Sequence, residues 1–294
     1  MVSKKGIIAL SVTAFIWAST FTVIKIGLER ITPLNLSFVR SIVATFFLLG
    51  WLLLRRNQQE IARALKFHLG YVIGLGLVGV ALFNILQNIG IGLTSSGIAS
   101  LLVASNPVFI LILSAMILGE KITRSKASGI VLGFGGIIMV TFLDQNMAIL
   151  LRSGSFWGNI LALLSAVCWA VYSVMNKSAL KRYSPLTLTA LAYLFGSLIL
   201  FFFCVTFEDV SLIFRWSLSS WSILLYLGIL ASGVTFYLWN YALSTMEASR
   251  VSVFIFLVPV VAIFLGKLIL SETITGFTFL GTALVLSGIY LMEK

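Results

Sequence analysis

Four stretches of this sequence carry polar or aromatic side chains at helical spacing, a pattern that can line a ligand cavity between helices. Asn84, Gln87 and Asn88 stand at positions i, i+3 and i+4, so one face of a helix would present three amides. Similar stripes occur in three other stretches, where the residues are Thr13, Trp17 and Thr20; Trp169, Tyr172, Ser173 and Asn176; and Tyr237, Asn240 and Tyr241. For each residue, packing and hydrogen bonding between helices is the alternative interpretation.

Groups for acid–base catalysis are scarce in this sequence. Glu120 and Glu272 fall at the ends of apolar stretches, and Glu29 and Glu247 fall in or next to loops, so the deep parts of these stretches hold no carboxylate. The only histidine, His68, also lies near the end of a stretch. Acid–base chemistry and proton pathways both need positioned ionisable groups. The sequence therefore disfavours an enzyme and does not support a carboxylate-based proton-coupled mechanism.

Metal and redox chemistry have no better support in the sequence. The two cysteines, Cys168 and Cys204, lie within apolar stretches and indicate neither a disulfide framework nor a metal site. We therefore expect reduced, buried thiols, no metal and no cofactor.

The composition requires a membrane around these stretches. Sixty per cent of the residues are hydrophobic and 10% are charged, and the mean hydropathy is +1.11, whereas a soluble domain is roughly half apolar and a quarter charged. About 20 apolar residues suffice to cross a bilayer as a helix. We predict ten such spans, near residues 6–26, 33–54, 69–91, 96–118, 127–143, 155–177, 186–207, 219–241, 249–270 and 276–292. The chain is thus predicted to be an all-α, multi-pass integral membrane protein of the plasma or inner membrane, with the lipid bilayer as its surroundings.

Charge placement predicts the orientation of the spans. Lysine and arginine collect at alternate helix ends, which carry Lys4 and Lys5; Arg55, Arg56, Arg63 and Lys66; Lys121, Arg124 and Lys126; and Lys177, Lys181 and Arg182. By the positive-inside rule, both termini are cytoplasmic. The net charge of +11 is therefore a topology signal. No basic run is long enough to follow a nucleic-acid backbone, and we expect no nucleic-acid partner.

An internal duplication organises the chain. The segment FIWASTFTVIKIGLERITPL at 15–34 returns as VCWAVYSVMNKSALKRYSPL at 167–186, a spacing of 152 residues. The same register pairs scarce residues: Trp17 with Trp169, Asn88 with Asn240, Pro107 with Pro259 and Glu120 with Glu272. We predict two repeats, 1–146 and 147–294, of five spans each. Because five is odd, the second repeat must cross the membrane in the opposite orientation, as in many secondary transporters.

Three residues at depth stand apart from the polar stripes. Pro107 and Pro259 sit at the centres of their spans, and each frees the carbonyl four residues earlier, which suits a hinge, a cavity wall or a static kink. Arg40 lies about two turns inside the second span, and its repeat counterpart is Ala192. A charge at this depth is a functional candidate, although its long side chain could instead reach the outer surface. We group Pro107, Pro259 and Arg40 as hinge or gating candidates.

The end of each repeat carries a family resemblance. The sequence has LGEKIT at 118–123 and LSETIT at 270–275, followed by GIVLGFGGIIMV at 129–140 and GTALVLSGIYLM at 281–292. These segments resemble the EamA-type repeat of the drug/metabolite transporter superfamily, and the similarity runs from about Gly6 to Met292. The resemblance implies ten helices, cytoplasmic termini and a central cavity lined mainly by spans 1, 3, 4, 6, 8 and 9. Members mostly export amino acids and other small metabolites, and the aromatic-rich chain looks most like the amino-acid exporter branch called YddG.

These features together predict a secondary transporter that works by alternating access. A cavity of amides, hydroxyls and aromatic rings, without a fixed charge at its centre, suits ligands that are neutral overall, such as zwitterionic amino acids. We predict export of neutral, hydrophobic or aromatic amino acids and related small metabolites by a monomer. The predicted substrate-binding residues are Trp17, Thr20, Asn84, Gln87, Asn88, Trp169, Tyr172, Ser173, Asn176, Tyr237, Asn240 and Tyr241. The alternatives are a broad drug or metabolite exporter, a channel-like pore, and a membrane-embedded enzyme or scaffold.

Overall fold

The structure is a computed structural model that describes residues 4–55, 58–94, 96–139, 155–262 and 276–293. Parts of two predicted spans, residues 140–143 and 263–270, lie outside these ranges, as do Glu272 and the predicted boundary between the repeats at 146–147. Within the described ranges the regular structure is entirely helical.

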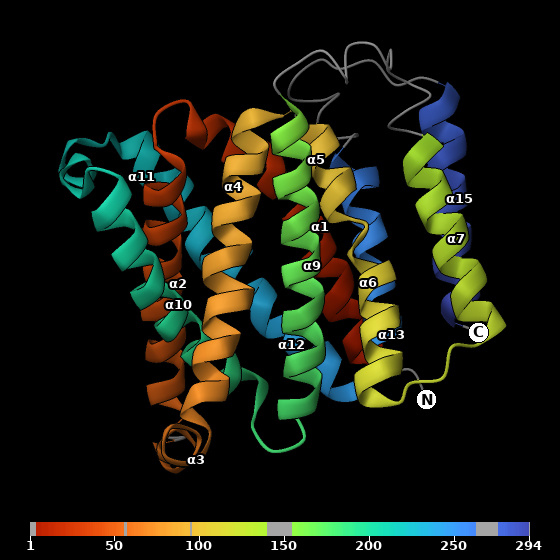
Figure 1. Ribbon diagram of the computed structural model, residues 1–294, viewed down its shortest axis with the longest axis horizontal. Coiled ribbons are helices and arrows are strands. Elements are labelled where there is room, and N and C mark those ends of the chain that lie inside the picture. The colour runs from red at the N-terminus through yellow and green to blue at the C-terminus, as the bar shows by residue number, and fades with distance from the viewer. Residues whose placement is uncertain (1–3, 56–57, 95, 140–154, 263–275, 294) are drawn as a thin grey trace.

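Long helices run between the two ends of the molecule, and the two chain termini lie at the same end (Figure 1). The α-helices are α1 (Lys4–Leu28), α2 (Pro33–Leu54), α3 (Gln58–Gly76), α4 (Phe83–Leu93), α5 (Ser96–Val103), α6 (Asn106–Leu113), α7 (Arg124–Ile138), α9 (Ser155–Ala179), α10 (Pro185–Phe207), α11 (Leu218–Leu225), α12 (Thr235–Thr245), α13 (Ala248–Val253) and α15 (Gly276–Glu293). Between them lie π-helical segments η1 (Leu77–Leu82), η2 (Ser114–Leu118) and η5 (Tyr226–Val234), and 3-10 segments η4 (Val210–Arg215) and η6 (Phe254–Phe256).

Six described helices are long and apolar enough to cross a membrane: Lys4–Leu28, Pro33–Leu54, Gln58–Leu93, Phe156–Ala179, Pro185–Phe207 and Leu218–Thr245. They coincide with six of the spans that the sequence predicts. Shorter apolar helices occupy Asn106–Leu118, Ala248–Ala262 and Phe279–Gly288. The chain is therefore an all-helical, multi-pass membrane protein, while the total of ten spans stays a prediction.

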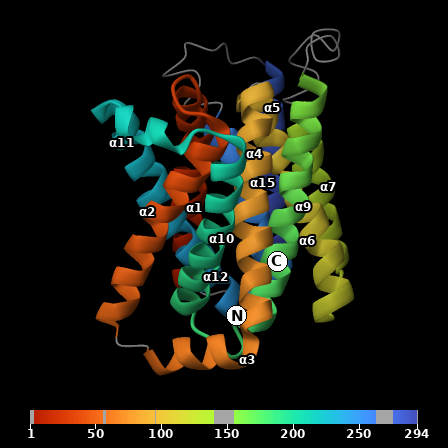
Figure 2. The ribbon, with the colours of Figure 1, turned by 60° about the vertical axis from the view of Figure 1, so that its left-hand side comes forward.

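The third predicted span begins earlier in the structure than in the sequence analysis. Helix α3 starts at Gln58 instead of residue 69, and His68 has a non-helical φ of −137° that bends it. The part before the bend lies across the end of the bundle (Figure 2). Its exposed Arg63, Lys66 and Phe67 are residue types that suit the boundary between headgroups and acyl chains, which explains why a hydropathy pattern did not include them.

Proline and carboxylate side chains determine where two of the long helices begin. Pro33 and Pro185 open α2 and α10, directly after residues in extended conformation, and proline is well suited to a first helical position. The Glu208 carboxylate accepts hydrogen bonds from the backbone N–H groups of Leu34 and Asn35, at 3.1 and 2.8 Å. Free N–H groups at a helix start favour a negative charge, so this acidic residue outside the spans stabilises a helix start.

Two lysines bind the ends of other helices in a matching way. Lys25 Nζ donates to the carbonyl oxygens of Ile91 and Thr94, both at 2.9 Å. Lys177 Nζ donates to those of Leu243 and Met246, at 2.7 and 2.6 Å. Both the lysines and their partners are 152 residues apart, and each ammonium pairs with carbonyls that have no partner within their own helix.

A second carboxylate lies at the start of α13 and has a salt bridge beside it. Glu120 accepts from the backbone N–H groups of Ala248 and Ser249, at 2.7 and 3.2 Å. In the preceding turn, Glu247 lies 2.6 Å from the Lys126 ammonium. The hydrogen bond from Lys126 lowers the pKa of Glu247 below its ordinary value. These contacts connect the chain after η2 and the start of α7 to the start of α13.

Two glycines allow helices to touch through their backbones. A Cβ atom at Gly76 would lie 2.7 Å from the backbone nitrogen of Gly196 and 2.8 Å from the carbonyl oxygen of Ala192. A Cβ at Gly228 would lie 2.8 Å from the carbonyl oxygen of Arg40. Both gaps are too short for a methyl group, so α3 and α10, and likewise η5 and α2, need glycine at their crossing points.

We predict that Gly76→Ala lowers the free energy of unfolding by about 1–3 kcal/mol, because the new methyl group must push two backbones apart. The matched control is Gly70→Ala in the same helix, where nothing lies within 4 Å of the new atom; alanine there should be neutral or stabilise the helix by up to about 1 kcal/mol. Apparent melting temperatures in detergent would compare the two variants. Equal melting temperatures would contradict the proposed backbone contact.

Candidate functional site

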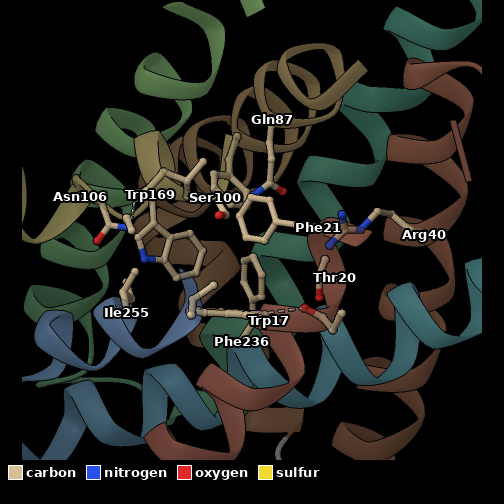
Figure 3. A pocket seen from close by; sticks show the side chains of 15 residues that line it. Trp17, Thr20, Phe21, Arg40, Gln87, Ser100, Asn106, Trp169, Phe236 and Ile255 are labelled. Carbon is tan, nitrogen blue, oxygen red and sulfur yellow. Dashed lines mark hydrogen bonds between the residues drawn. The ribbon is translucent and has the colours of Figure 1, made fainter. Parts of the chain in front are cut away.

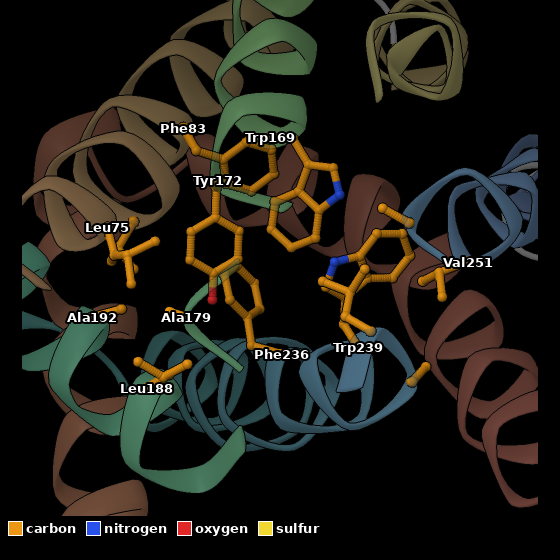
Figure 4. Packing of buried hydrophobic residues seen from close by; sticks show 14 of the residues in the cluster. Leu75, Phe83, Trp169, Tyr172, Ala179, Leu188, Ala192, Phe236, Trp239 and Val251 are labelled. Atoms are coloured by element: carbon orange, nitrogen blue, oxygen red, sulfur yellow. The ribbon is translucent and has the colours of Figure 1, made fainter. Parts of the chain in front are cut away.

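An aromatic cluster joins four helices at the centre of the bundle. Trp17 of α1 and Trp169 of α9 meet edge to face, with ring centroids 5.1 Å apart. Phe236 of α12 lies 4.9 Å from Trp169, and Phe83, at the start of α4, lies 5.0 Å from it. Figure 4 shows the rings of Phe83, Trp169 and Phe236 together with Trp239. The two tryptophans that match across the repeat are therefore in direct contact.

The two tryptophans differ in how their indole nitrogens are bonded. Trp17 Nε1 donates to Thr235 Oγ1 at 2.8 Å, and the carbonyl oxygen of Ala231 lies 3.2 Å away. Trp169 is 2% exposed, and its Nε1 has no hydrogen-bond partner among the described residues. A buried N–H without a partner costs free energy. It could be relieved by a bound ligand or water.

A small cavity borders this cluster. It is lined by Trp17, Thr20, Phe21, Arg40, Phe83, Gln87, Ser100, Val103, Ala104, Asn106, Trp169, Ala231, Phe236, Ile255 and Val258. Figure 3 shows Arg40, Thr20 and Gln87 toward one side, and Asn106, Trp169 and Ile255 toward the other. Its volume of about 40 Å³ is room for a few water molecules. The cavity must therefore widen before it can hold an amino acid.

Four of the predicted substrate-binding residues line this cavity: Trp17, Thr20, Gln87 and Trp169. The Gln87 side chain is 5% exposed and makes no hydrogen bond with other described residues. It is therefore the one amide of its stripe that is available to a ligand.

The other eight predicted residues, Asn84, Asn88, Tyr172, Ser173, Asn176, Tyr237, Asn240 and Tyr241, are absent from the lining. Two of the buried amides among them connect helices: Asn88 Nδ2 donates to Ser37 Oγ at 2.7 Å, and Asn240 Nδ2 donates to Thr189 Oγ1 at 2.8 Å. Asn84 and Asn176 instead donate to carbonyl oxygens one turn earlier in their own chain segments. Asn240 Nδ2 also lies 3.1 Å from the Tyr172 hydroxyl oxygen. Asn88, Asn240 and Tyr172 therefore fit the alternative interpretation, hydrogen bonding between helices.

Both prolines lie beside the cavity wall. Pro107 follows a break at Ala104 and Ser105 that separates α5 from α6, and Pro259 follows the 3-10 turn η6. The carbonyl of Val103, which Pro107 leaves without its usual partner, accepts a hydrogen bond from Asn106 Nδ2 at 2.9 Å. The break is thus stabilised from within the chain, and its neighbours Val103, Ala104 and Asn106 line the cavity. The hinge role of the prolines stays a prediction.

Arg40 does not extend to the surface: it is 2% exposed and lines the cavity. Its Nε and Nη2 donate to Ser232 Oγ at 3.2 and 3.0 Å, and its Nη1 has no partner in the part of the chain that the structure describes. The expectation of a cavity without a fixed charge is therefore wrong. The error arose because sequence distance from the helix end does not show which way a side chain points.

Several lining residues were missed by the sequence analysis, although a signal existed for some. Phe21 follows Trp17 by four residues and Phe83 precedes Gln87 by four, so each shares a helix face with a predicted residue. Asn106 is an amide directly before a proline in an apolar span. No comparable signal marks Ala231 or Val258, because apolar residues at these positions look like ordinary packing.

The whole chain is similar to known transporters. The model of the EamA-like transporter family matches residues 4–142 and again 156–293. An "Uncharacterized transporter" of Archaeoglobus fulgidus is 33% identical over 292 residues, which is 99% of each chain. A "Probable amino-acid metabolite efflux pump" of Escherichia coli is 28% identical over 99% of this chain and 95% of its own. A "Probable terminal-alkyne amino-acid exporter" of Streptantibioticus cattleyicolor is 27% identical over 99% of this chain and 94% of its own.

A solved crystal structure has the same fold. It superposes with a TM-score of 0.78 over 99% of this chain and 98% of its own, at 20% identity. At this identity the likeness concerns the fold alone.

We predict that Asn240→Ala and Gln87→Ala affect stability differently, since one amide links helices and the other has no partner. Asn240→Ala should lower the free energy of unfolding by about 1–3 kcal/mol, because two buried hydroxyl groups lose the hydrogen bond that they accept from Asn240. Gln87→Ala should change it by less than about 0.5 kcal/mol. The apparent melting temperatures of the purified variants would test this. A larger loss for Gln87→Ala would mean that Gln87 belongs to the packing.

Proposed function

The chain belongs to the EamA-like transporter family of the drug/metabolite transporter superfamily, and from this we propose that it exports amino acids and related small metabolites by alternating access. Handling small molecules in a membrane is what the family implies. The observation that supports the finer proposal best is the cavity at the contact of Trp17 and Trp169, where aromatic rings and unpaired polar groups border the same space.

We infer that the chain consists of two five-span repeats of opposite orientation. The matched lysine contacts, the glycine crossings at Gly76 and Gly228, and the tryptophan pair all recur at an offset of 152 residues. The family model also matches the chain twice, over 4–142 and 156–293. Inverted repeats allow one half to adopt the conformation of the other, so that the site can open to either side of the membrane. The positive-inside pattern puts both termini in the cytoplasm, with the protein in the plasma or inner membrane.

Elements that can move lie next to the cavity. The proline breaks before α6 and after η6 border it, and the π-helical segments η1 and η5 lie within the long helices that form its walls. π-Helical segments are rare and occur frequently at functional sites, and each proline removes one backbone hydrogen bond. Opening would need to enlarge a cavity of about 40 Å³, and these are the places where the helices can bend. Pro107, Pro259 and Arg40 are the proposed hinge and gating residues.

Amino acids are the proposed substrate class because of the chemistry of the lining. Rings of Trp17, Phe21 and Phe236 suit a hydrophobic or aromatic side chain, and Gln87 with Asn106 can bond polar groups. Two relatives carry names that refer to amino-acid export. The described spans hold no carboxylate that faces this cavity, so we propose transport without carboxylate-based proton coupling, by a monomer.

The proposal predicts saturable uptake of labelled phenylalanine or methionine into proteoliposomes of the purified protein, at a rate that a pH gradient does not change. Unlabelled amino acid on the far side should accelerate uptake by counter-exchange, as a carrier requires. Linear, non-saturating flux would indicate a pore. If no amino acid is taken up but unrelated drugs are, the result would favour a broad drug or metabolite exporter.

Trp17→Ala and Trp169→Ala should each reduce this uptake by about ten-fold or more, since an aromatic contact is worth roughly 0.5–1.5 kcal/mol beyond its buried area and both rings also shape the cavity. The matched control is Trp157→Ala at the start of α9, where the ring is 66% exposed and faces away from the core. Expression and gel filtration should be normal for the control and both variants. Unchanged uptake in both cavity variants would contradict the proposed site.

A further inference from the structure

We propose that Arg40 binds a carboxylate group of the transported molecule, so that the substrates are small organic carboxylates, amino acids among them, while amines without a carboxylate are rejected. This inference rests on the proposed transport function and names the chemistry that its site selects. It assigns Arg40 to substrate binding, beyond a role in gating.

The guanidinium of Arg40 is buried and only partly bonded. The residue is 2% exposed, and Ser232 Oγ occupies one edge of the guanidinium, the edge of Nε and Nη2, at 3.2 and 3.0 Å. Nη1 has no acceptor within the described ranges. Arginine carries five N–H donors in a fixed plane and keeps its charge at any physiological pH. The outer end of the group is thus available, and the cavity is what it borders.

The charge of Arg40 is also unbalanced among the described residues. The two salt bridges among the described residues both involve Glu247, which pairs with Lys126 and Arg250 at the end of the bundle. A buried charge is costly unless an opposite charge and hydrogen bonds compensate it. A carboxylate would supply both, because its two oxygens match two parallel N–H groups of a guanidinium.

The surroundings of Arg40 separate the polar and apolar parts of a ligand. Thr20 and Gln87 lie near it on one side of the cavity, and Phe21 is next to them (Figure 3). Thr20 Oγ1 donates to the carbonyl oxygen of Ile16 at 3.0 Å, so its lone pairs remain free to accept. Gln87 can donate to a carboxylate or accept from an ammonium. An ammonium would therefore meet neutral groups, while a carboxylate meets a full charge.

This difference predicts which part of an amino acid is indispensable. Removing the ammonium loses neutral hydrogen bonds, whereas removing the carboxylate leaves two positive charges in one poorly hydrated cavity, where their repulsion is strong. The site should accept phenylalanine and 3-phenylpropionate, which share a ring and a carboxylate. It should reject 2-phenylethylamine, which shares only the ring and the ammonium.

The test measures competition by these three compounds against uptake of labelled phenylalanine in proteoliposomes, and their effect on the melting temperature of the purified protein. Phenylalanine and 3-phenylpropionate should compete and stabilise, and the amine should do neither at ten times the concentration. Arg40→Gln should weaken both carboxylates on the order of ten- to hundred-fold, as expected for loss of a charge-assisted hydrogen-bonded pair. Arg40→Lys keeps the positive charge but loses the planar guanidinium. Its affinity for the two carboxylates should lie between those of the wild type and Arg40→Gln.

Two controls separate binding from folding. Arg30→Gln makes the same charge change at an exposed turn residue and should leave all three responses unchanged. Without ligand, Arg40→Gln should melt no lower than the wild type, because it removes a buried charge that lacks a partner; a purely structural arginine would instead cost stability.

Each result bears on the proposal. Loss of the carboxylate responses in Arg40→Gln, with its folding intact, supports it. If Arg40→Gln still takes up phenylalanine as the wild type does, or if the amine competes as well as the carboxylates, Arg40 does not bind the carboxylate. Either result leaves the proposed transport function standing. If the wild-type protein neither binds nor transports any amino acid or carboxylate, both the carboxylate binding by Arg40 and the proposed function are overturned.

Discussion

A lipid bilayer offers no hydrogen bonds, and this constraint explains where the polar residues of this protein lie. Every polar group in a span must find its partner inside the bundle or face a cavity. Many buried hydroxyls donate to a carbonyl one turn earlier in their own helix, as Thr13 and Thr45 do. Some amides bond across helices instead, as Asn88 with Ser37 and Asn240 with Thr189 illustrate. Two unpaired N–H donors, Arg40 Nη1 and Trp169 Nε1, instead belong to residues that line the same cavity.

The same constraint accounts for the positions of the few carboxylates and of two lysines. Helix ends leave backbone groups unpaired, and the chain satisfies several of these with charged side chains from distant segments. Glu208 and Glu120 bond to helix starts, and Lys25 and Lys177 bond to helix ends. These long-range caps connect helices that would otherwise be held only by packing, and they keep negative charge away from the cavity. Arg40 is left as the charge that the cavity contains.

The small cavity and the helix breaks at its border fit one physical account of transport. Ring contacts between Trp17 and Trp169 fill the centre of the bundle, and the proline breaks leave the adjacent helices in shorter pieces. A ligand that separated the rings would have to supply interactions for the polar groups on both sides. The group with most to gain is the guanidinium, since its desolvation is already complete.

The sequence by itself determined the membrane class, six spans that the structure describes, the proline starts of α2 and α10, and the family. These features depend on composition and on local spacing, which act within one helix. It also predicted Trp17, Thr20, Gln87 and Trp169 for the site, because they are unusual residue types at depth. Only the tertiary structure decided which amides of a stripe bond to neighbouring helices and which face the cavity, because both have the same periodicity. It also decided that Arg40 turns inward, since a long side chain follows the partners that other helices offer, here Ser232, and these are distant in sequence.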